Sequence, residues 1–206
     1  METLGKLFGS IGKVKIMRLF IFNPDTPFDA KDVSLRSDVL PQEVALDLRT
    51  LEQAGFIRRR PFFKDVVNER TEKMSRVKAS GWVLDDRFLY ATELQNLLVH
   101  TVLFSDSDII KRLSRAGVLK FVAIAGVFIR EPESRVDLLV VGDNLKEKVI
   151  VNTVHSLEAE VGKEIRYVLL ETEDFKYRYG VFDKLVRDVL DYPHRTIIDR
   201  VGIKKY

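Results

Sequence analysis

Basic side chains crowd into one short stretch of this 206-residue sequence, between positions 56 and 80. The stretch holds eight Lys and Arg against three Asp and Glu. The eight are Arg58, Arg59, Arg60, Lys64, Arg70, Lys73, Arg76 and Lys78. Guanidinium and ammonium groups gathered in this way neutralise phosphates, and this contact is a large part of protein affinity for nucleic acid. A solvated charged hairpin without a ligand is the alternative interpretation.

Groups suited to acid–base, nucleophilic or metal chemistry are sparse. The chain has no cysteine, which excludes disulfides, thiolate metal sites and thiol nucleophiles. The histidines, His100, His155 and His194, lie far apart in the sequence, and no two have the spacing of metal ligands. There is no nucleophile-elbow serine, no GxxxxGKS/T loop and no GxGxxG turn. We therefore expect no catalytic residue, no metal and no cofactor.

The charge is uneven along the chain. The net charge is only +3 and the sequence pI is about 9.0, so affinity for nucleic acid requires a local patch. Residues 1–80 hold 15 basic and 11 acidic side chains, whereas residues 81–206 hold 19 and 20. No apolar run approaches the length of a membrane span, and no secretion signal is recognisable at the N-terminus. We expect a cytoplasmic protein without membrane contact.

Amphipathic spacing and turn residues predict three helices followed by a β-hairpin in the first half. Asp29 is placed to cap the second helix, and Pro41 suits the first position of the third. Val44, Ala45, Leu48 and Leu51 form the inward stripe of that third helix. The predicted elements are helices at 11–22, 29–36 and 41–55, strands at 56–63 and 77–84 around a polar connection at 64–76, and linking helices at 88–104 and 108–115.

The second half changes character, because short apolar runs that meet glycine predict buried strands. Thr172 is placed to cap a helical stretch that continues through Tyr192, and Asp143 to cap an earlier helix. The predicted elements are strands at 119–125, 136–141 and 164–170, a helix at 145–161 and the helical stretch from 172. The expected fold class is α+β, with an α/β domain at the C-terminus.

Three phrases occur in an informative order: LPQEVALDLRTLEQAGFIRRR, GWVLDDRFLYATELQNLLVHT and AIAGVFIREPESRVDLLVVGD. With them the chain resembles winged helix-turn-helix transcriptional regulators fused to a small nucleotidyltransferase-like domain, of the kind also found in minimal-nucleotidyltransferase antitoxins. The resemblance covers nearly the whole chain. It implies a winged helix-turn-helix domain over 1–86, a helical linker over 87–117 and a nucleotidyltransferase-like domain over 118–206.

The resemblance implies that the third helix and the basic hairpin contact duplex DNA. On the helix, Gln42 is suited to reading adenine and Arg49 to contacting guanine or phosphate. Glu43 and Asp47 are expected to face outward as well, where carboxylates repel phosphates. Leu46 on the same surface is suited to a protein partner instead.

In the nucleotidyltransferase family, a Gly-Ser turn follows the first strand, and two aspartates one residue apart on the next strand hold divalent metals. The matching positions here are Gly126 and Val127, then Arg135 and Asp137. One serine and one aspartate are therefore missing. We expect Arg135 to form an ion pair with Asp137 where a metal would otherwise bind. The resemblance thus implies a degenerate domain without catalysis.

These observations favour a DNA-binding protein similar to transcriptional regulators, whose C-terminal domain is an inactive scaffold for dimerisation or ligand sensing. The second part rests on analogy of fold. The expected partners are double-stranded DNA and a second copy of the chain in a homodimer. Three alternatives stay open: an active nucleotidyltransferase, an antitoxin that binds a toxin through its C-terminal domain, and a protein-interaction module.

Overall fold

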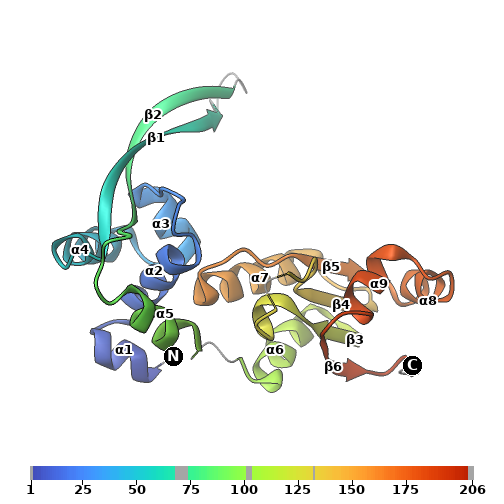
Figure 1. The fold of residues 1–206 in the computed structure, drawn as a ribbon. Helices are drawn as coiled ribbons and strands as arrows, with labels where there is room; N and C mark the ends of the chain where they lie inside the picture. The colour runs from blue at the N-terminus through green and yellow to red at the C-terminus, as the bar shows by residue number, and fades with distance from the viewer. Residues whose placement is uncertain (1, 68–73, 101–103, 132, 204–206) are drawn as a thin grey trace. The chain divides into compact units, whose positions relative to one another are not determined.

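The computed structural model describes residues 2–67, 74–100, 104–131 and 133–203 of an α+β chain, which confirms the expected fold class (Figure 1). The chain divides into two units. The first comprises residues 1–102 and 158–163, and the second comprises 103–157 and 164–206. Residues 87–117, expected to form a linker, are therefore shared between the two units. In the described part of the chain, no helix combines the length and apolar character needed to cross a bilayer.

The first unit consists of helices and one β-hairpin. Helix α2 begins after Ser10, whose hydroxyl accepts a hydrogen bond from the Lys13 amide at 2.9 Å. Asp29 caps α3 in a reciprocal capping box with Asp32, as the sequence predicts for Asp29. The elements are α1 Glu2–Phe8, α2 Ile11–Phe22, α3 Ala30–Ser37, α4 Pro41–Gln53, β1 Ile57–Val67, β2 Met74–Leu84 and α5 Ala91–His100. Helix α1 was not among the predicted elements.

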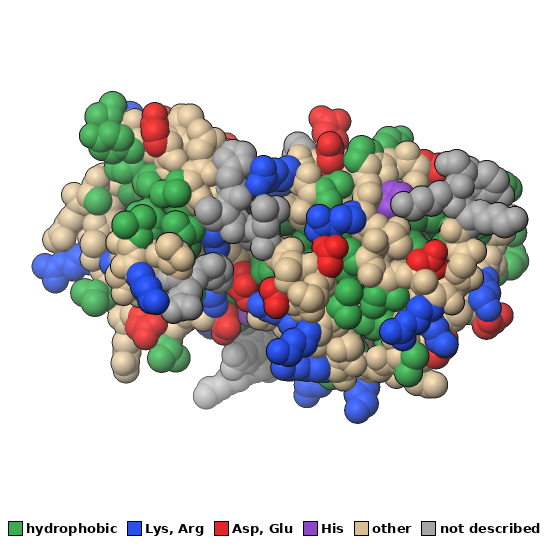
Figure 2. Space-filling view, turned by 90° about the horizontal axis from the view of Figure 1, so that it is seen from below, with side chains coloured by type: hydrophobic (Ala, Val, Ile, Leu, Met, Phe, Trp, Pro, Cys, Tyr) green, Lys and Arg blue, Asp and Glu red, His purple; other side chains and the backbone are tan. Residues whose placement is uncertain are grey.

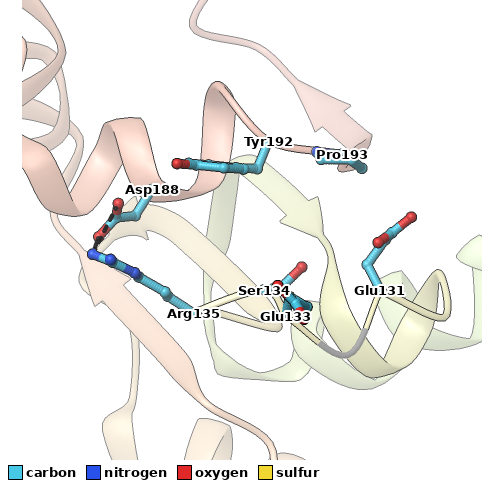
Figure 3. Close-up of a pocket in the computed structure, with 7 residues that line it drawn as sticks. All are labelled: Glu131, Glu133, Ser134, Arg135, Asp188, Tyr192 and Pro193. Carbon is cyan, nitrogen blue, oxygen red and sulfur yellow. Dashed lines mark hydrogen bonds and ion pairs between the residues drawn. The ribbon is translucent and has the colours of Figure 1, made fainter.

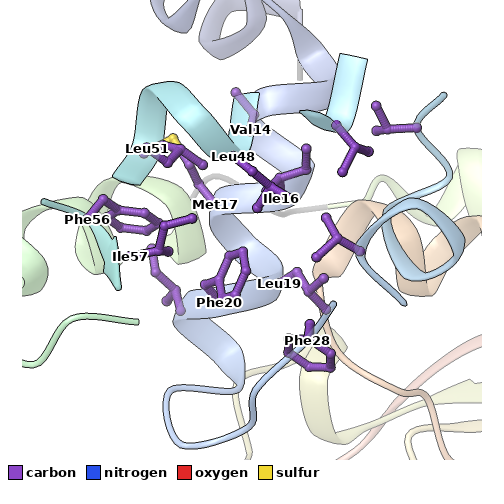
Figure 4. Packing of buried hydrophobic residues seen from close by; sticks show 14 of the residues in the cluster. Val14, Ile16, Met17, Leu19, Phe20, Phe28, Leu48, Leu51, Phe56 and Ile57 are labelled. Atoms are coloured by element: carbon purple, nitrogen blue, oxygen red, sulfur yellow. The ribbon is translucent and has the colours of Figure 1, made fainter. Parts of the chain in front are cut away.

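The core of this unit surrounds α2 (Figure 4). Val14, Ile16 and Phe20 of this helix are completely buried against α4 and the base of the hairpin. Arg18 on the same helix is also fully buried, and its Nε donates to the Leu98 carbonyl at 3.0 Å. Burial lowers the pKa of Arg18 to about 10, so the guanidinium remains charged at neutral pH. Helix α2 is thus enclosed on nearly all sides.

The hairpin is longer than the sequence predicts. Both strands have 11 residues and pair in continuous register from Ile57 opposite Leu84 to Val67 opposite Met74. Most of the predicted polar connection at 64–76 is therefore strand. Residues 65–66 and 74–76 are all exposed, so both faces of this part of the hairpin meet solvent and it lacks the apolar alternation that marks a half-buried strand in a sequence. Figure 1 shows that the hairpin, called the arm below, rises from the helices and that its far end extends beyond them.

A β-bridge between Phe28 and Trp82 fastens the base of the arm to the loop between α2 and α3. The Phe28 amide donates to the Trp82 carbonyl at 3.0 Å, and the Trp82 amide donates to the Phe28 carbonyl at 2.9 Å. Gly81 lies next to this bridge, where a Cβ atom would overlap the Phe28 carbonyl. The base of the arm is thereby held on the helical core.

The second unit is a four-stranded sheet with helices on both faces, in strand order β5-β4-β3-β6. Strand β3 is antiparallel to β4 and β6, and β4 is parallel to β5. Side chains such as Val122 and Val140 pack with α6 and α7, while Phe121 and Val141 pack with α8 and α9. The elements are α6 Asp106–Leu113, β3 Val118–Ile124, β4 Leu138–Asp143, α7 Glu147–Val161, β5 Tyr167–Leu170, α8 Thr172–Gly180, α9 Lys184–Leu190 and β6 Arg195–Asp199.

Three sequence predictions for this unit need correction. Thr172 is the first residue of α8 rather than its cap, because Glu171 occupies the N-cap position and makes no capping hydrogen bond. The helical stretch does not continue through Tyr192, since the chain turns between α8 and α9 with Phe182 at a φ of 56°. Asp143 ends β4 instead of capping a helix, and its carboxylate lies 3.7 Å from Lys120 Nζ. Strand β6 was not predicted.

Candidate functional site

The exposed side of α4 carries the residues that the resemblance singles out. Gln42, Leu46 and Arg49 are all exposed, and their spacing of four and three residues places them in one stripe. Leu46 has 67% of its surface exposed. The opposite side of the helix is buried in the core through Val44 and Leu48. Helix α4 thus presents to solvent a stripe of two polar residues with Leu46 between them, as the sequence predicts for these three residues.

Asp47 differs from its predicted outward position. It is buried, and its carboxylate forms an ion pair with Lys13 Nζ at 3.2 Å. The helical period explains the placement, because position 47 follows 44 by three residues and therefore shares its side of the helix. Ala45, predicted to face inward, is exposed for the same reason. Only one of the two predicted repulsive carboxylates, that of Glu43, remains on the exposed side.

Arg59 is held against its own protein at the base of the arm. Its guanidinium stacks over the Trp82 ring, with Cζ 3.9 Å from the centroid. Its Nε also donates to both carboxylate oxygens of Glu52 on α4, at 3.1 and 3.2 Å. Trp82 Nε1 donates to the same carboxylate at 2.9 Å. The three side chains form a closed cluster that fastens the arm to α4.

Lys64 is the second anchored cation. Its ammonium group forms ion pairs with Asp29 and, at 3.3 Å, with Asp32 at the start of α3. The hydrogen bond to Asp29 raises the pKa of Lys64 above its ordinary value. Burial alone would raise the pKa of Asp29, but the hydrogen bonds from Lys64 and the Asp32 amide hold it below its ordinary value. Lys64 therefore joins one face of the arm to α3.

Arg58 lies next to two carboxylates, with its Nε 3.9 Å from Asp85 and 3.7 Å from Asp86. Asp85 is itself buried and accepts two hydrogen bonds from the guanidinium of Arg87, at 3.1 Å each. These hydrogen bonds lower the pKa of Asp85. Arg58 thus belongs to a cluster of charged side chains at the base of the arm, just after β2 ends.

Three further cations of the arm point to solvent. Arg60, Arg76 and Lys78 are exposed, and within the described part of the chain no carboxylate lies within ion-pair distance of them. Arg60 donates to the Asp25 carbonyl at 3.4 Å. Arg70 and Lys73, also predicted to contact DNA, lie outside the described residues. On the face of the molecule in Figure 2, by contrast, basic and acidic side chains are interspersed and no large area of one sign is visible.

The second candidate site is the turn after β3, where Asp137 lies. Its side chain is 1% exposed and accepts four hydrogen bonds. The Val127 amide donates to Oδ1 at 3.0 Å, and the Arg166 amide donates to Oδ2 at 2.9 Å. The Arg166 guanidinium adds Nε to Oδ2 at 2.9 Å and Nη2 to Oδ1 at 3.1 Å. Both oxygens are occupied by donors from the chain itself.

The predicted ion pair between Arg135 and Asp137 is therefore wrong. Arg166 takes that place, because β4 and β5 are parallel neighbours and residues 137 and 166 directly precede them. Arg135 instead pairs with Asp188 on α9, at 3.1 Å. Neither Arg135 nor Asp137 lies on β4, which begins at Leu138. The pairing joins residues 29 positions apart, so spacing along the chain gave no signal for it.

The turn itself is closed around this carboxylate. Gly126 has a φ of +49°, and a Cβ atom there would overlap Asp137 Oδ1. The Gly126 amide donates to the Ser134 hydroxyl at 3.1 Å, a residue that the sequence analysis did not single out. Among the described residues, no three His, Asp or Glu side chains come together as a metal site would require. Asp137 thus organises the turn and leaves no oxygen for a cation.

A cavity of about 270 Å³ opens beside this turn (Figure 3). Arg135 and Asp188 meet on one side of it, and Glu131 lies on the other. Its lining comprises Glu131, Glu133, Ser134, Arg135, Asp188, Tyr192 and Pro193. Three carboxylates against one guanidinium give the cavity a negative charge, which repels a nucleotide triphosphate. The geometry beside the Asp137 turn therefore does not favour nucleotide binding.

Comparison of the chain with protein-family models, with curated proteins and with solved structures finds no match. The function is therefore argued from the geometry of α4, the arm and the Asp137 turn.

Proposed function

We propose that the protein binds duplex DNA through α4 and the arm, in the manner of a winged helix-turn-helix regulator acting in the cytoplasm. The observation that carries the proposal is the exposed stripe of α4, with Gln42 and Arg49, on a helix whose other side is fixed in the core. Exposed amide and guanidinium groups on such a helix are suited to base edges in the major groove. The outward cations of the arm add phosphate contacts.

The order of elements supports the same proposal. Helices α2, α3 and α4 are followed by the arm, and the Phe28 bridge adds a third strand position at its base. Burial of Asp47 against Lys13 removes one of the two carboxylates that would repel phosphate from α4. For the second unit we propose a non-catalytic role as a scaffold, which includes formation of a homodimer. The hydrogen bonds that occupy Asp137 support the absence of catalysis.

The first test is binding to genomic duplex fragments, selected from a pool and then measured by fluorescence anisotropy over a range of salt concentrations. We expect salt-sensitive binding and an enriched sequence. Replacing Gln42 or Arg49 with alanine should relax discrimination at particular base pairs by about 1–3 kcal/mol. The matched control removes exposed polar groups of the second unit, with Lys148→Ala and Lys184→Ala. Absence of salt-sensitive duplex binding by the native chain would refute the proposal.

One observation favours a second candidate function, that of a protein-interaction module or antitoxin. Leu40 and Leu46 have 66% and 67% of their surfaces exposed at the start and middle of α4. Large apolar side chains on a polar helix surface are suited to a protein partner. Copurification of a stoichiometric protein that is lost in a Leu46→Ser variant, with no duplex binding by the native chain, would favour this candidate.

A further inference from the structure

The outer half of the arm has two chemically different faces. Residues directly opposite each other in an antiparallel pair share a face, and side chains alternate along each strand. Phe63 lies opposite Lys78, and Asp65 lies opposite Arg76, so these four share one face, and Met74 joins them two positions from Arg76. We call this set the outer face of the arm.

The opposite face is turned toward α3. Lys64 is on it, and its ion pairs with Asp29 and Asp32 fix its direction. The outer face therefore points away from α3, and its large apolar groups are mostly exposed. Phe63 is 60% exposed and Met74 is 72% exposed. Such exposure on an ordered strand pair leaves apolar surface in water that a ligand could bury.

Cations are interleaved with these apolar groups. The Arg76 guanidinium lies over the Phe63 ring, 5.4 Å from its centroid, and Lys78 is directly across the strand pair from Phe63. Asp65 is the only carboxylate of this face within the described residues. A surface of this kind matches a polyanion that also offers apolar surface between its charges. Duplex DNA does so in the minor groove, where the base steps lie between two rows of phosphates.

We propose that the outer face enters the minor groove, where Phe63 and Met74, four strand positions apart, each press against a different base step and bend the duplex while Arg76 and Lys78 contact the flanking phosphates. Apolar wedges of this kind partly unstack a base step, and the bend brings more DNA into contact with the protein. The inference rests on the proposed binding of DNA and adds to it a deformation. The energy spent on unstacking makes affinity depend on how flexible the step is, so the arm selects sequence through DNA shape.

The experiment measures bending directly, by energy transfer between dyes on the two ends of a selected duplex of about 30 bp. Saturating native protein should raise the transfer efficiency above that of free DNA. The variant Phe63→Ser with Met74→Ser should bind about tenfold more weakly and, once saturated, leave the efficiency near that of free DNA. The matched control is Val66→Ser with Val77→Ser, two partly exposed apolar residues of the other face, which should keep the bend.

The outcomes separate this inference from the proposed function. Salt-sensitive binding without a change in transfer, or a bend that survives in the Phe63 and Met74 variant, overturns the wedge and leaves DNA binding intact. Absence of any duplex binding by the native chain overturns both. Phosphatidylcholine–phosphatidylserine vesicles are titrated in parallel, and binding to vesicles but not to duplex assigns the outer face to a membrane surface instead. Circular dichroism of each variant checks that its fold is unchanged.

Discussion

The arm and the Asp137 turn are both rich in charged residues, but the charges are exposed on the outer half of the arm and paired within the fold at the turn. On the outer half of the arm, Arg76 and Lys78 face solvent, and no carboxylate of the described residues lies within ion-pair distance of them. At the turn, Asp137 is buried and bound by Arg166 and two amides. Charges that the fold has not already paired remain available for a ligand, whereas paired and buried charges serve the fold.

The same distinction divides the arm itself. Arg59 and Lys64 are paired with Glu52 and with Asp29 and Asp32, although composition alone treats them as equal to Arg76. Alanine substitution of an anchored cation is therefore expected to change stability, and substitution of an outward cation to change binding.

The largest effect is expected at Asp137. Replacing it with alanine leaves the amides of Val127 and Arg166 without their acceptor and removes the partner of the Arg166 guanidinium. We expect the free energy of unfolding in urea to fall by about 3 kcal/mol. Arg135→Ala is the control, because its pair with Asp188 is exposed and should contribute less than about 1 kcal/mol. Equal losses in the two variants would contradict the structural role of Asp137.

The next effect concerns the outward cations. The double variant Arg76→Ala with Lys78→Ala should weaken binding to every duplex by about tenfold or more and lower the salt slope by about 2, because two phosphate contacts are lost. Its thermal unfolding should match that of the native chain. Arg59→Ala should behave in the reverse way, with lower stability and a nearly unchanged salt slope. If Arg59→Ala alters the salt slope as much as the double variant does, the distinction between anchored and outward cations of the arm is wrong.

A smaller effect is expected for the anchor at Lys64, where the stabilisation depends on pH. The pKa of Asp29 is held low in the folded state, so the stability that its carboxylate contributes is present above the ordinary carboxyl pKa and is lost as the pH falls below it. The pKa of Lys64 is raised, so the stability that its ammonium group contributes is lost only as the pH rises past that raised value. Lys64→Ala should therefore cost about 1 kcal/mol between these limits. Denaturant titrations from neutral to acid pH should show the difference shrinking below the carboxyl pKa.

The smallest effect is expected for Arg135→Asp. The substitution places acidic residues at both 135 and 137, but Asp137 stays bound to Arg166 and both its oxygens stay occupied. We expect neither Mg²⁺ binding by calorimetry nor incorporation of labelled nucleotide, in the variant or in the native chain. Metal-dependent transfer by the native chain that disappears in Asp137→Ala would promote the nucleotidyltransferase interpretation.

Much of the fold was predictable from local signals. The cap at Asp29, the proline at the start of α4 and the apolar runs of β3 and β4 each act within a few residues, so their elements were correctly expected. The missed features lack such signals. Strand β6 is a short edge strand of mixed character, and the outer arm is exposed on both faces, so neither has apolar alternation.

For the candidate sites, the sequence was sufficient to predict the basic composition of the arm and the exposure of Gln42 and Arg49. Which charges are paired depends on the tertiary structure. Arg166 reaches Asp137 because two parallel strands lie side by side, and Lys64 reaches Asp29 because the arm folds back along α3. An ion pair depends on distance in space, and only the packing of distant segments sets that distance.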